Sequence, residues 1–389
     1  MNSHADRGGL ISDARRVARE VLARNADRHD RASSQPLDDY AALRAGGYYG
    51  MLIPAQYGGW GLDLATYCEA IHELAQGAAA TATAFNMHNF AMWNIAVLGS
   101  EAQKRHWFGK VLSEGVLMGG WGSEPGAGLA ANRYAIATTI AARPDGYELN
   151  GDKFFCTLAG VAKYASVLVV PEEHARDVRL EDICQVIVPT DAPGVVIDAE
   201  WDVLGMRATV SPAVTFKRVT VAKDHMLGRP GDNLITRGLP EAISIGYAGV
   251  YSGLARAALG FAVDYAARKK VAGGRLVDQP VVQCRLAELA IEVDCAYAFA
   301  LQAARELDAD FQAGARRNAG SRARAVAMRS VLDVTSRAFE VCGGTTVSRR
   351  YPLGRYYREA RTMTLMSPGY DGIVGAVGKR MAEEAVAAL

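Results

Sequence analysis

The fold is decided by residues 120–157, which begin Gly-Trp-Gly-Ser-Glu-Pro-Gly-Ala-Gly (120–128) and end Leu-Asn-Gly-Asp-Lys-Phe-Phe-Cys-Thr (149–157). Glycine has no Cβ, so the first part predicts a turn whose backbone N–H groups can approach a ligand closely. The alternating, β-branched residues 134–142 predict a strand, and Asn150-Gly151 predicts a hairpin turn after it. A donor-rich turn beside aromatic Phe155 and the hydroxyl of Thr157 suits a flavin ring.

The rest of the chain divides into three units around this stretch. Helical periodicity predicts an all-α unit over residues 1–118, with Gly99-Ser100 ending one helix and capping the next. Over residues 119–232, β-branched runs separated by Pro, Gly and Asp turns are typical of a small barrel or sandwich. Long helical segments joined by short loops over residues 233–389 indicate a bundle. The predicted fold class is therefore α+β, in the order helical, β, helical.

Composition narrows the possible functions. The chain of 389 residues has 43 Lys and Arg against 42 Asp and Glu, so no broad basic field for nucleic acid is expected. Its six cysteines show no Cys-x-x-Cys pairing, which favours scattered thiols in a reducing compartment, and no metal site is expected. No apolar stretch approaches membrane-spanning length, and the N-terminus lacks the apolar segment of a signal peptide. We expect a cytoplasmic, soluble protein.

Several short segments, in the same order, resemble the acyl-CoA dehydrogenase superfamily of flavoproteins. The resemblance covers nearly the whole chain. It is carried by residues 50–61 (Gly-Met-Leu-Ile-Pro-Ala-Gln-Tyr-Gly-Gly-Trp-Gly), 99–104, 123–128, 149–155, 204–209, Gln283, 342–344 and 357–361. It implies an N-terminal helical domain, a central small β-barrel and a C-terminal four-helix bundle. It also implies FAD as cofactor, and a homotetramer because the family shares the FAD tail between subunits.

The resemblance assigns the cofactor residues position by position. Those that match the family's flavin-ring site are Gly122, Ser123, Phe155 and Thr157. Those that match its FAD-tail site are Lys269, Gln283, Glu340, Gly343 and Gly344. Lys269 stands where the family has an arginine, with Arg268 one position earlier, and Glu340 stands where a glutamine is usual. A lysine can neutralise phosphate, but it lacks the bidentate fork of arginine.

The family's catalytic base is missing from its usual places. Where the family has the glutamate that removes the substrate's α-proton, this chain has Ser367, and the alternative base position is occupied by Ile243. Neither side chain can accept such a proton. The nearest carboxylate is Glu241, which is the candidate base, with Asp371 as a second candidate; the alternative interpretation of both is a role at a helix start.

Two functions remain open on these residues. The first is α,β-dehydrogenation of an acyl-CoA or acyl-carrier-protein thioester, with an electron-transfer flavoprotein as acceptor. The second is a monooxygenase of the same fold that takes reduced flavin from a flavin reductase. Candidate substrate-side residues are His88, Leu129, Thr209 and Ser367, and Leu129 stands where the family has a serine that touches CoA. A flavin-bearing or flavin-free structural homologue without turnover is a third class, and a yellow protein that substrate bleaches would argue against it.

Overall fold

A computed structural model of the chain describes residues 7–125, 136–228, 232 and 236–387. The N-terminal helices are α1 (Arg7–Val17), α2 (Ala23–Ala32), α3 (Leu37–Ala45), α4 (Leu64–Gly77), α5 (Ala79–Leu98) and α6 (Glu101–Gly109). Capping side chains mark the starts of two of these helices. Asp63 caps α4 by accepting from the Thr66 N–H at 2.7 Å, and Ser100 with Gln103 forms a capping box at the start of α6. The predicted cap at Ser100 is confirmed.

An eight-stranded sheet follows. Its strands are β1 (Met118–Trp121), β2 (Thr139–Arg143), β3 (Gly146–Lys153), β4 (Tyr164–Pro171), β5 (Cys184–Pro189), β6 (Val195–Ile197), β7 (Val214–Ala222) and β8 (Met226–Leu227). The order is β6-β7-β3-β2-β4-β5-β8, and β1 pairs in parallel with β4. Alternate residues of β4 and β5, such as Val167, Val169, Val186 and Val188, face one apolar core.

One predicted turn is wrong. The chain reverses between β2 and β3 at Pro144-Asp145, and Asn150-Gly151 lies inside β3. There the pairing with β7 shifts register, and the Asn150 side chain accepts from the Arg218 backbone N–H at 2.9 Å. A Cβ on Gly151 would lie 2.6 Å from Thr138 Cα. Asn-Gly therefore marks a β-bulge at a close backbone approach rather than a hairpin turn.

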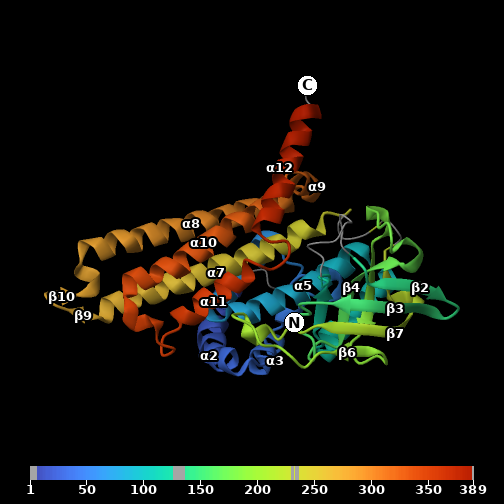
Figure 1. Ribbon diagram of the computed structural model, residues 1–389, viewed down its shortest axis with the longest axis horizontal. Helices are drawn as coiled ribbons and strands as arrows, with labels where there is room; N and C mark the ends of the chain where they lie inside the picture. The colour runs from blue at the N-terminus through green and yellow to red at the C-terminus, as the bar shows by residue number, and fades with distance from the viewer. Residues whose placement is uncertain (1–6, 126–135, 229–231, 233–235, 388–389) are drawn as a thin grey trace.

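The C-terminal helices are α7 (Leu239–Arg268), α8 (Pro280–Ala309), α9 (Phe311–Arg316), α10 (Ala319–Cys342), α11 (Leu353–Met363) and α12 (Tyr370–Ala387), with a small hairpin of β9 (Lys270–Val271) and β10 (Gly274–Arg275). In Figure 1, α7, α8 and α10 run side by side, the β9–β10 hairpin lies at the end far from the sheet, and α12 projects from the body. Helix α7 has 30 residues and so is about 45 Å long. The predicted helical, β, helical order is confirmed. None of the helices in the described ranges is long and apolar enough for a membrane span.

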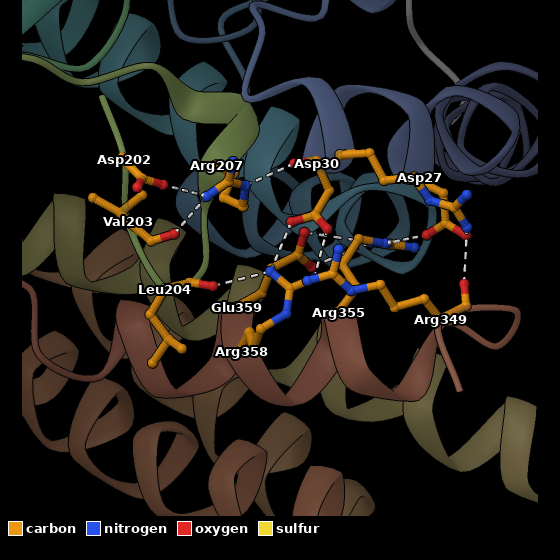
Figure 2. A network of polar contacts seen from close by, with 11 residues as sticks. Asp27, Asp30, Asp202, Val203, Leu204, Arg207, Arg349, Arg355, Arg358 and Glu359 are labelled. Atoms are coloured by element: carbon orange, nitrogen blue, oxygen red, sulfur yellow. Dashed lines mark hydrogen bonds and ion pairs between the residues drawn. The ribbon is translucent and has the colours of Figure 1, made fainter. Parts of the chain in front are cut away.

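A cluster of arginines and carboxylates joins the three units (Figure 2). We call it the arginine knot: Asp27 and Asp30 of α2, Arg207 before the sheet's long strand β7, and Arg355, Arg358 and Glu359 of α11. Arg358 binds both carboxylate oxygens of Asp30, at 3.0 and 2.6 Å, and also donates to the Leu204 carbonyl at 2.9 Å. Arg207 donates to the Asp30 carbonyl at 2.9 Å. One side chain of α11 thus touches both other units.

Two members of the knot are almost inaccessible to water. Arg355 bridges Asp27 at 2.7 Å and Glu359 at 3.2 Å, and Glu359 is buried. Gly205 lets the chain pass close by, since a Cβ there would lie 2.1 Å from the Arg358 carbonyl oxygen. Buried ion pairs are costly to break, because removal of one partner leaves the other charge unpaired. The knot therefore fixes how α2, α11 and the segment before β7 meet.

We predict that Arg355→Met destabilises the protein by about 3–5 kcal/mol, because Glu359 is then buried without its partner. Urea unfolding measures the change. Arg268→Met is the matched control, since its pair with Asp264 is exposed and little effect is expected. The double change Arg355→Met with Glu359→Leu should recover part of the loss. Equal effects of Arg355→Met and Arg268→Met would contradict a stabilising knot.

Candidate functional site

The two halves of the glycine-rich stretch meet at the end of β1. The Phe154 N–H donates to the Ser123 carbonyl at 2.9 Å. Next to it, the Glu124 carboxylate accepts from the Lys153 ammonium at 2.5 Å and from the backbone N–H groups of residues 137 and 138 at 2.6 and 3.1 Å. Burial lowers the pKa of Lys153, and the Glu124 carboxylate opposes that shift. This buried pair holds half-buried Gly122 and Ser123 beside the aromatic residues that follow β3.

Phe155 is held in an unusual backbone conformation with its ring exposed. Its φ is +54°, in the left-handed region that a non-glycine residue adopts at a cost of about 1–3 kcal/mol. Its side chain is 42% exposed and that of Phe154 is 39% exposed, with ring centroids 4.2 Å apart. Two exposed aromatic rings next to a glycine-rich turn can stack on a flat ligand.

A chain of buried hydroxyls lies behind this surface. Ser211 Oγ is 2.9 Å from Oγ1 of Thr157 and 2.9 Å from Oγ1 of Thr209, and Thr209 donates to the Met206 carbonyl at 2.9 Å. The Trp121 ring N–H donates to the Thr157 carbonyl at 3.0 Å. Since a hydroxyl can rotate to donate or accept, Thr157 can serve either kind of ligand atom. The structure thus joins Thr157 and Thr209, which were predicted as cofactor-side and substrate-side residues.

His88 uses both ring nitrogens on backbone groups. Nε2 lies 3.1 Å from the Tyr49 carbonyl oxygen, so it carries the proton, and Nδ1 accepts from the Met118 N–H at 3.1 Å. Burial lowers the pKa of His88 to about 4, against the opposing effect of the Tyr49 carbonyl. This fully buried, neutral ring ties α5 to the start of β1. It positions the strand that leads to Ser123, and it has no nitrogen free for a substrate.

The Glu241 carboxylate is engaged at a helix start. One oxygen accepts from the Ser321 N–H at 2.9 Å and the other from the Ser321 hydroxyl at 2.6 Å. Burial raises the pKa of Glu241, and the bonds from Ser321 oppose the rise. Both oxygens thus bind the first turn of α10, whereas the alternative interpretation from the sequence placed the role of Glu241 at the start of its own helix, α7.

The predicted FAD-tail residues gather at the other end of the bundle (Figure 1). They lie at the end of α7 (Lys269), the start of α8 (Gln283) and the end of α10 (Glu340, Gly343 and Gly344). Arg285 donates to the Glu340 carbonyl at 3.0 Å, so the ends of α8 and α10 touch. Helix α7 separates them from Glu241 by most of its length of about 45 Å. Within one chain, they do not join Ser123 and Thr157.

Three further residues were predicted from the sequence as substrate-side or catalytic candidates: Ser367, Asp371 and Leu129. Ser367 is exposed between α11 and α12, and Asp371 is exposed in the first turn of α12. Leu129 lies outside the described residues. Across the described part of the chain, no group of three or more His, Cys, Asp or Glu side chains is arranged to hold a metal ion.

Comparison with known proteins identifies the family. The acyl-CoA dehydrogenase N-terminal, middle and C-terminal domains match residues 7–115, 120–219 and 243–378. The short-chain specific acyl-CoA dehydrogenase of Bos taurus mitochondria is 30% identical over 318 residues, which cover 81% of this chain and 75% of that protein. The chain belongs to the acyl-CoA dehydrogenase family. The predicted family and fold are confirmed.

The acyl-CoA dehydrogenase family makes this chain a flavin-dependent oxidoreductase, as the sequence predicts. Other relatives are monooxygenases. The dibenzothiophene monooxygenase of Rhodococcus qingshengii is 29% identical over 383 residues, covering 92% of this chain and 89% of that protein. The FMN-bound structure of dibenzothiophene monooxygenase from Paenibacillus sp. A11-2 has a TM-score of 0.87 and 27% identity, over 97% of this chain and 98% of that chain.

Some site features had weak signals in the sequence. Glu124 and Lys153 are 29 positions apart, and only strand pairing brings their charges together. Ser211 stands between two predicted threonines in space, although it lies in no quoted motif. The Phe154-Phe155 pair stands in a quoted motif, but its exposure is visible only in the structure, and the role of Phe155 at a flavin ring stays a prediction.

We predict that stability falls as the pH drops from 7 to 5, in part through His88. The folded pKa of about 4 lies below the value of about 6.5 for an unfolded histidine, so the unfolded state binds more protons in this window. The contribution of His88 is present above pH 6.5 and is lost as the pH falls towards 4, by about 2 kcal/mol between pH 7 and 5.

The measurement is urea unfolding at both pH values. His88→Gln should flatten the slope of stability against pH, whereas His106→Gln, at an exposed histidine, should keep it. A slope that is the same in His88→Gln as in the unchanged protein would show that His88 is not held neutral.

Proposed function

We propose that the protein is a monooxygenase that uses reduced flavin supplied by a separate flavin reductase. The observation that carries the proposal is the state of Glu241, whose two carboxylate oxygens are both bound by Ser321. Dehydrogenation of an acyl thioester needs a carboxylate to accept the α-proton, and Ser367 stands where the family has that group. Oxygenation by reduced flavin needs no such base.

The residues beside β1 fit a flavin ring. Phe155 offers an open aromatic face, Ser123 and its neighbours offer backbone groups at a strand end, and Thr157 offers a hydroxyl backed by Ser211. An oxidised flavin has a hydrogen-bond acceptor at N5, and a reduced flavin has an N–H there. Because its proton can rotate, the Thr157 hydroxyl can serve both states.

A second copy of the chain would complete the site for an extended cofactor. The FAD-tail residues of one chain are exposed and lie at the end of its bundle that is far from its own sheet (Figure 1). We therefore propose that a partner chain supplies Lys269, Gln283 and the Gly343-Gly344 turn, in a homo-oligomer such as the tetramer implied by the resemblance. FMN, which lacks the adenosine tail, would need fewer of these contacts.

When bound, reduced flavin would supply the two electrons that let one atom of O₂ enter the substrate while the other leaves as water. Phe155 would hold the flavin ring by stacking, and the Thr157 hydroxyl would bind the ring edge. His88 keeps β1 against α5, and the buried Lys153–Glu124 pair holds the turn without a net charge.

The comparisons support this choice. Dibenzothiophene monooxygenases match this chain over about nine-tenths of its length, and a relative of that class has been solved with FMN. The short-chain specific acyl-CoA dehydrogenase of Homo sapiens matches 90% of the chain at 29% identity, so the choice between the two reactions rests on Glu241 and Ser367. Neither relative fixes the substrate of this protein.

We predict that the purified protein consumes O₂ and oxygenates an aromatic sulfur or nitrogen compound only with NAD(P)H, flavin and a flavin reductase. Dibenzothiophene and indole are suitable first probes, with product detected by mass spectrometry. The protein should not be bleached anaerobically by butyryl-CoA. Glu241→Gln keeps an acceptor for Ser321 and should retain oxygenation. Anaerobic bleaching by acyl-CoA that Glu241→Gln abolishes would instead support the dehydrogenase.

We also predict that Thr157→Val weakens flavin binding about 5- to 10-fold, because it removes one hydrogen bond worth roughly 1 kcal/mol. Fluorescence titration with FMN and FAD measures the affinity. Ser211→Ala, which alters the hydroxyl behind Thr157, should have a smaller effect. Unchanged affinity and unchanged flavin absorbance in Thr157→Val would contradict the proposed ring site.

A further inference from the structure

A pocket of about 550 Å³ lies against the arginine knot, between α2, the segment before β7 and the segment that leads into α11. Five guanidinium groups of the described chain line it: Arg31, Arg207, Arg349, Arg355 and Arg358. Two carboxylates of the described chain line it as well, those of Asp27 and Asp30. Figure 2 labels all of these residues except Arg31. The volume is in the range of small-molecule sites, and the lining carries a net positive charge.

The knot leaves two of these guanidinium groups without a carboxylate. Its own arginines, Arg207, Arg355 and Arg358, each form an ion pair. Among the residues that the structure describes, neither Arg31 nor Arg349 forms one. The Arg31 guanidinium donates to the Arg349 carbonyl at 2.8 Å, which uses one of its five N–H groups. Two positive charges that no described carboxylate neutralises therefore face one pocket.

This arrangement of charges favours an anion. Like charges that line one concave site repel each other, and the low-dielectric walls of the protein strengthen their field. An anion in the pocket would remove that repulsion. It would also accept charge-assisted hydrogen bonds, which are stronger than those between neutral groups. Asp27 and Asp30 oppose an anion only weakly, because Arg355 and Arg358 already bind them.

The start of α11 adds backbone donors to the same wall. The first N–H groups of a helix have no partner within the helix. No side chain caps this end of α11, and no acidic residue lies in its first turn. Gly354 lines the pocket, and a Cβ built on it would meet no atom within 4 Å, so space remains beside these donors. The helix start thus supports the anion that the two arginines favour.

Apolar and aromatic side chains form the other part of the lining. Leu204, Val347 and Tyr357 line the pocket, and each of them is exposed. Tyr351 lines it as well, and its ring packs against Tyr265 of α7 with centroids 5.7 Å apart, which holds the segment before α11 in place. A ligand with a ring or an apolar chain would cover the exposed side chains while its charge meets the arginines.

We propose that this pocket binds a phosphate monoester that carries an aromatic or apolar group. Two unneutralised arginines match a ligand with two negative charges. A phosphate monoester carries a charge of about −1.5 to −2 at neutral pH, whereas a carboxylate or sulfonate carries one. The planar guanidinium also fits two phosphate oxygens at once. The phosphate binds Arg31 and Arg349, and the organic group lies on Leu204, Val347 and Tyr357.

The pocket shares no residue with the predicted flavin-ring or FAD-tail residues. The proposal therefore depends on neither flavin nor turnover. A bound ligand would join α2 to the segment before α11, where the knot already connects them. Since it binds the folded chain alone, it should also raise the resistance of the protein to unfolding.

Phenyl phosphate and benzenesulfonate test the ligand class. Both carry one aromatic ring, but the phosphate group carries the larger charge. Their dissociation constants are measured by calorimetry on the full chain, at neutral pH and low ionic strength to limit screening. Phenyl phosphate should bind more tightly than benzenesulfonate, and more tightly than inorganic phosphate, which has no ring. Equal Kd values for phenyl phosphate and either other ligand would overturn the proposed class.

Arg349→Met and Arg31→Met test the site. Each should raise the Kd of phenyl phosphate about 10-fold, because each removes a hydrogen-bonding group of opposite charge. Arg350→Met is the matched control, since this adjacent arginine is exposed but does not line the pocket. It should keep the Kd of the unchanged protein. Arg31 and Arg349 are exposed, so both variants should stay folded, which circular dichroism checks.

Equal Kd values in Arg349→Met and Arg350→Met would overturn the proposal, and so would failure of phenyl phosphate to bind to the unchanged protein. Thr157→Val, altered at the proposed flavin ring site, should keep the affinity. A Kd raised as much in Thr157→Val as in Arg349→Met would place phenyl phosphate at the flavin site and also overturn the proposal. Binding that Arg31→Met and Arg349→Met alone weaken, in a protein that shows no oxygenation, would uphold the pocket and count against the proposed function alone.

Discussion

The contact between Arg358 and Asp30 supports the arrangement of all three units. It joins α11 to α2, and the same guanidinium holds the Leu204 carbonyl of the segment that leads to Thr209 and Ser211. Arg355 and Glu359 extend it into a region with little water, where charges without partners are expensive.

The candidate flavin site draws on the sheet unit and on the N-terminal helices. The segment after β3 supplies Phe155, and the end of β1 supplies the turn at Ser123. His88 of α5 links the two units by hydrogen bonds to backbone groups alone. His88, predicted from the sequence as a substrate-side residue, thus has a structural role: it holds α5 against β1. The carboxylate of Glu241 serves in the same way between α7 and α10.

The sequence predicted features that depend on neighbours along the chain. The helix cap at Ser100, the order of the units and the junction of residues 123 and 154 follow from periodicity, capping chemistry and motif. Features that depend on distant partners were not predictable. Asn150-Gly151 has the composition of a turn, yet β7 makes it a bulge. The buried pair of Glu124 and Lys153, 29 positions apart, is visible only once the fold brings the two side chains together.

The left-handed backbone of Phe155 places two demands on one position. Glycine or asparagine would suit the conformation better and would make the folded chain more robust, but either would remove the aromatic face. Where Phe155 stacks on the flavin, as proposed, a residue that stabilises this position would weaken flavin binding. Selection for thermal stability alone would replace Phe155 by glycine or asparagine. An aromatic residue kept at this position in close homologues would therefore indicate that cofactor binding is still under selection.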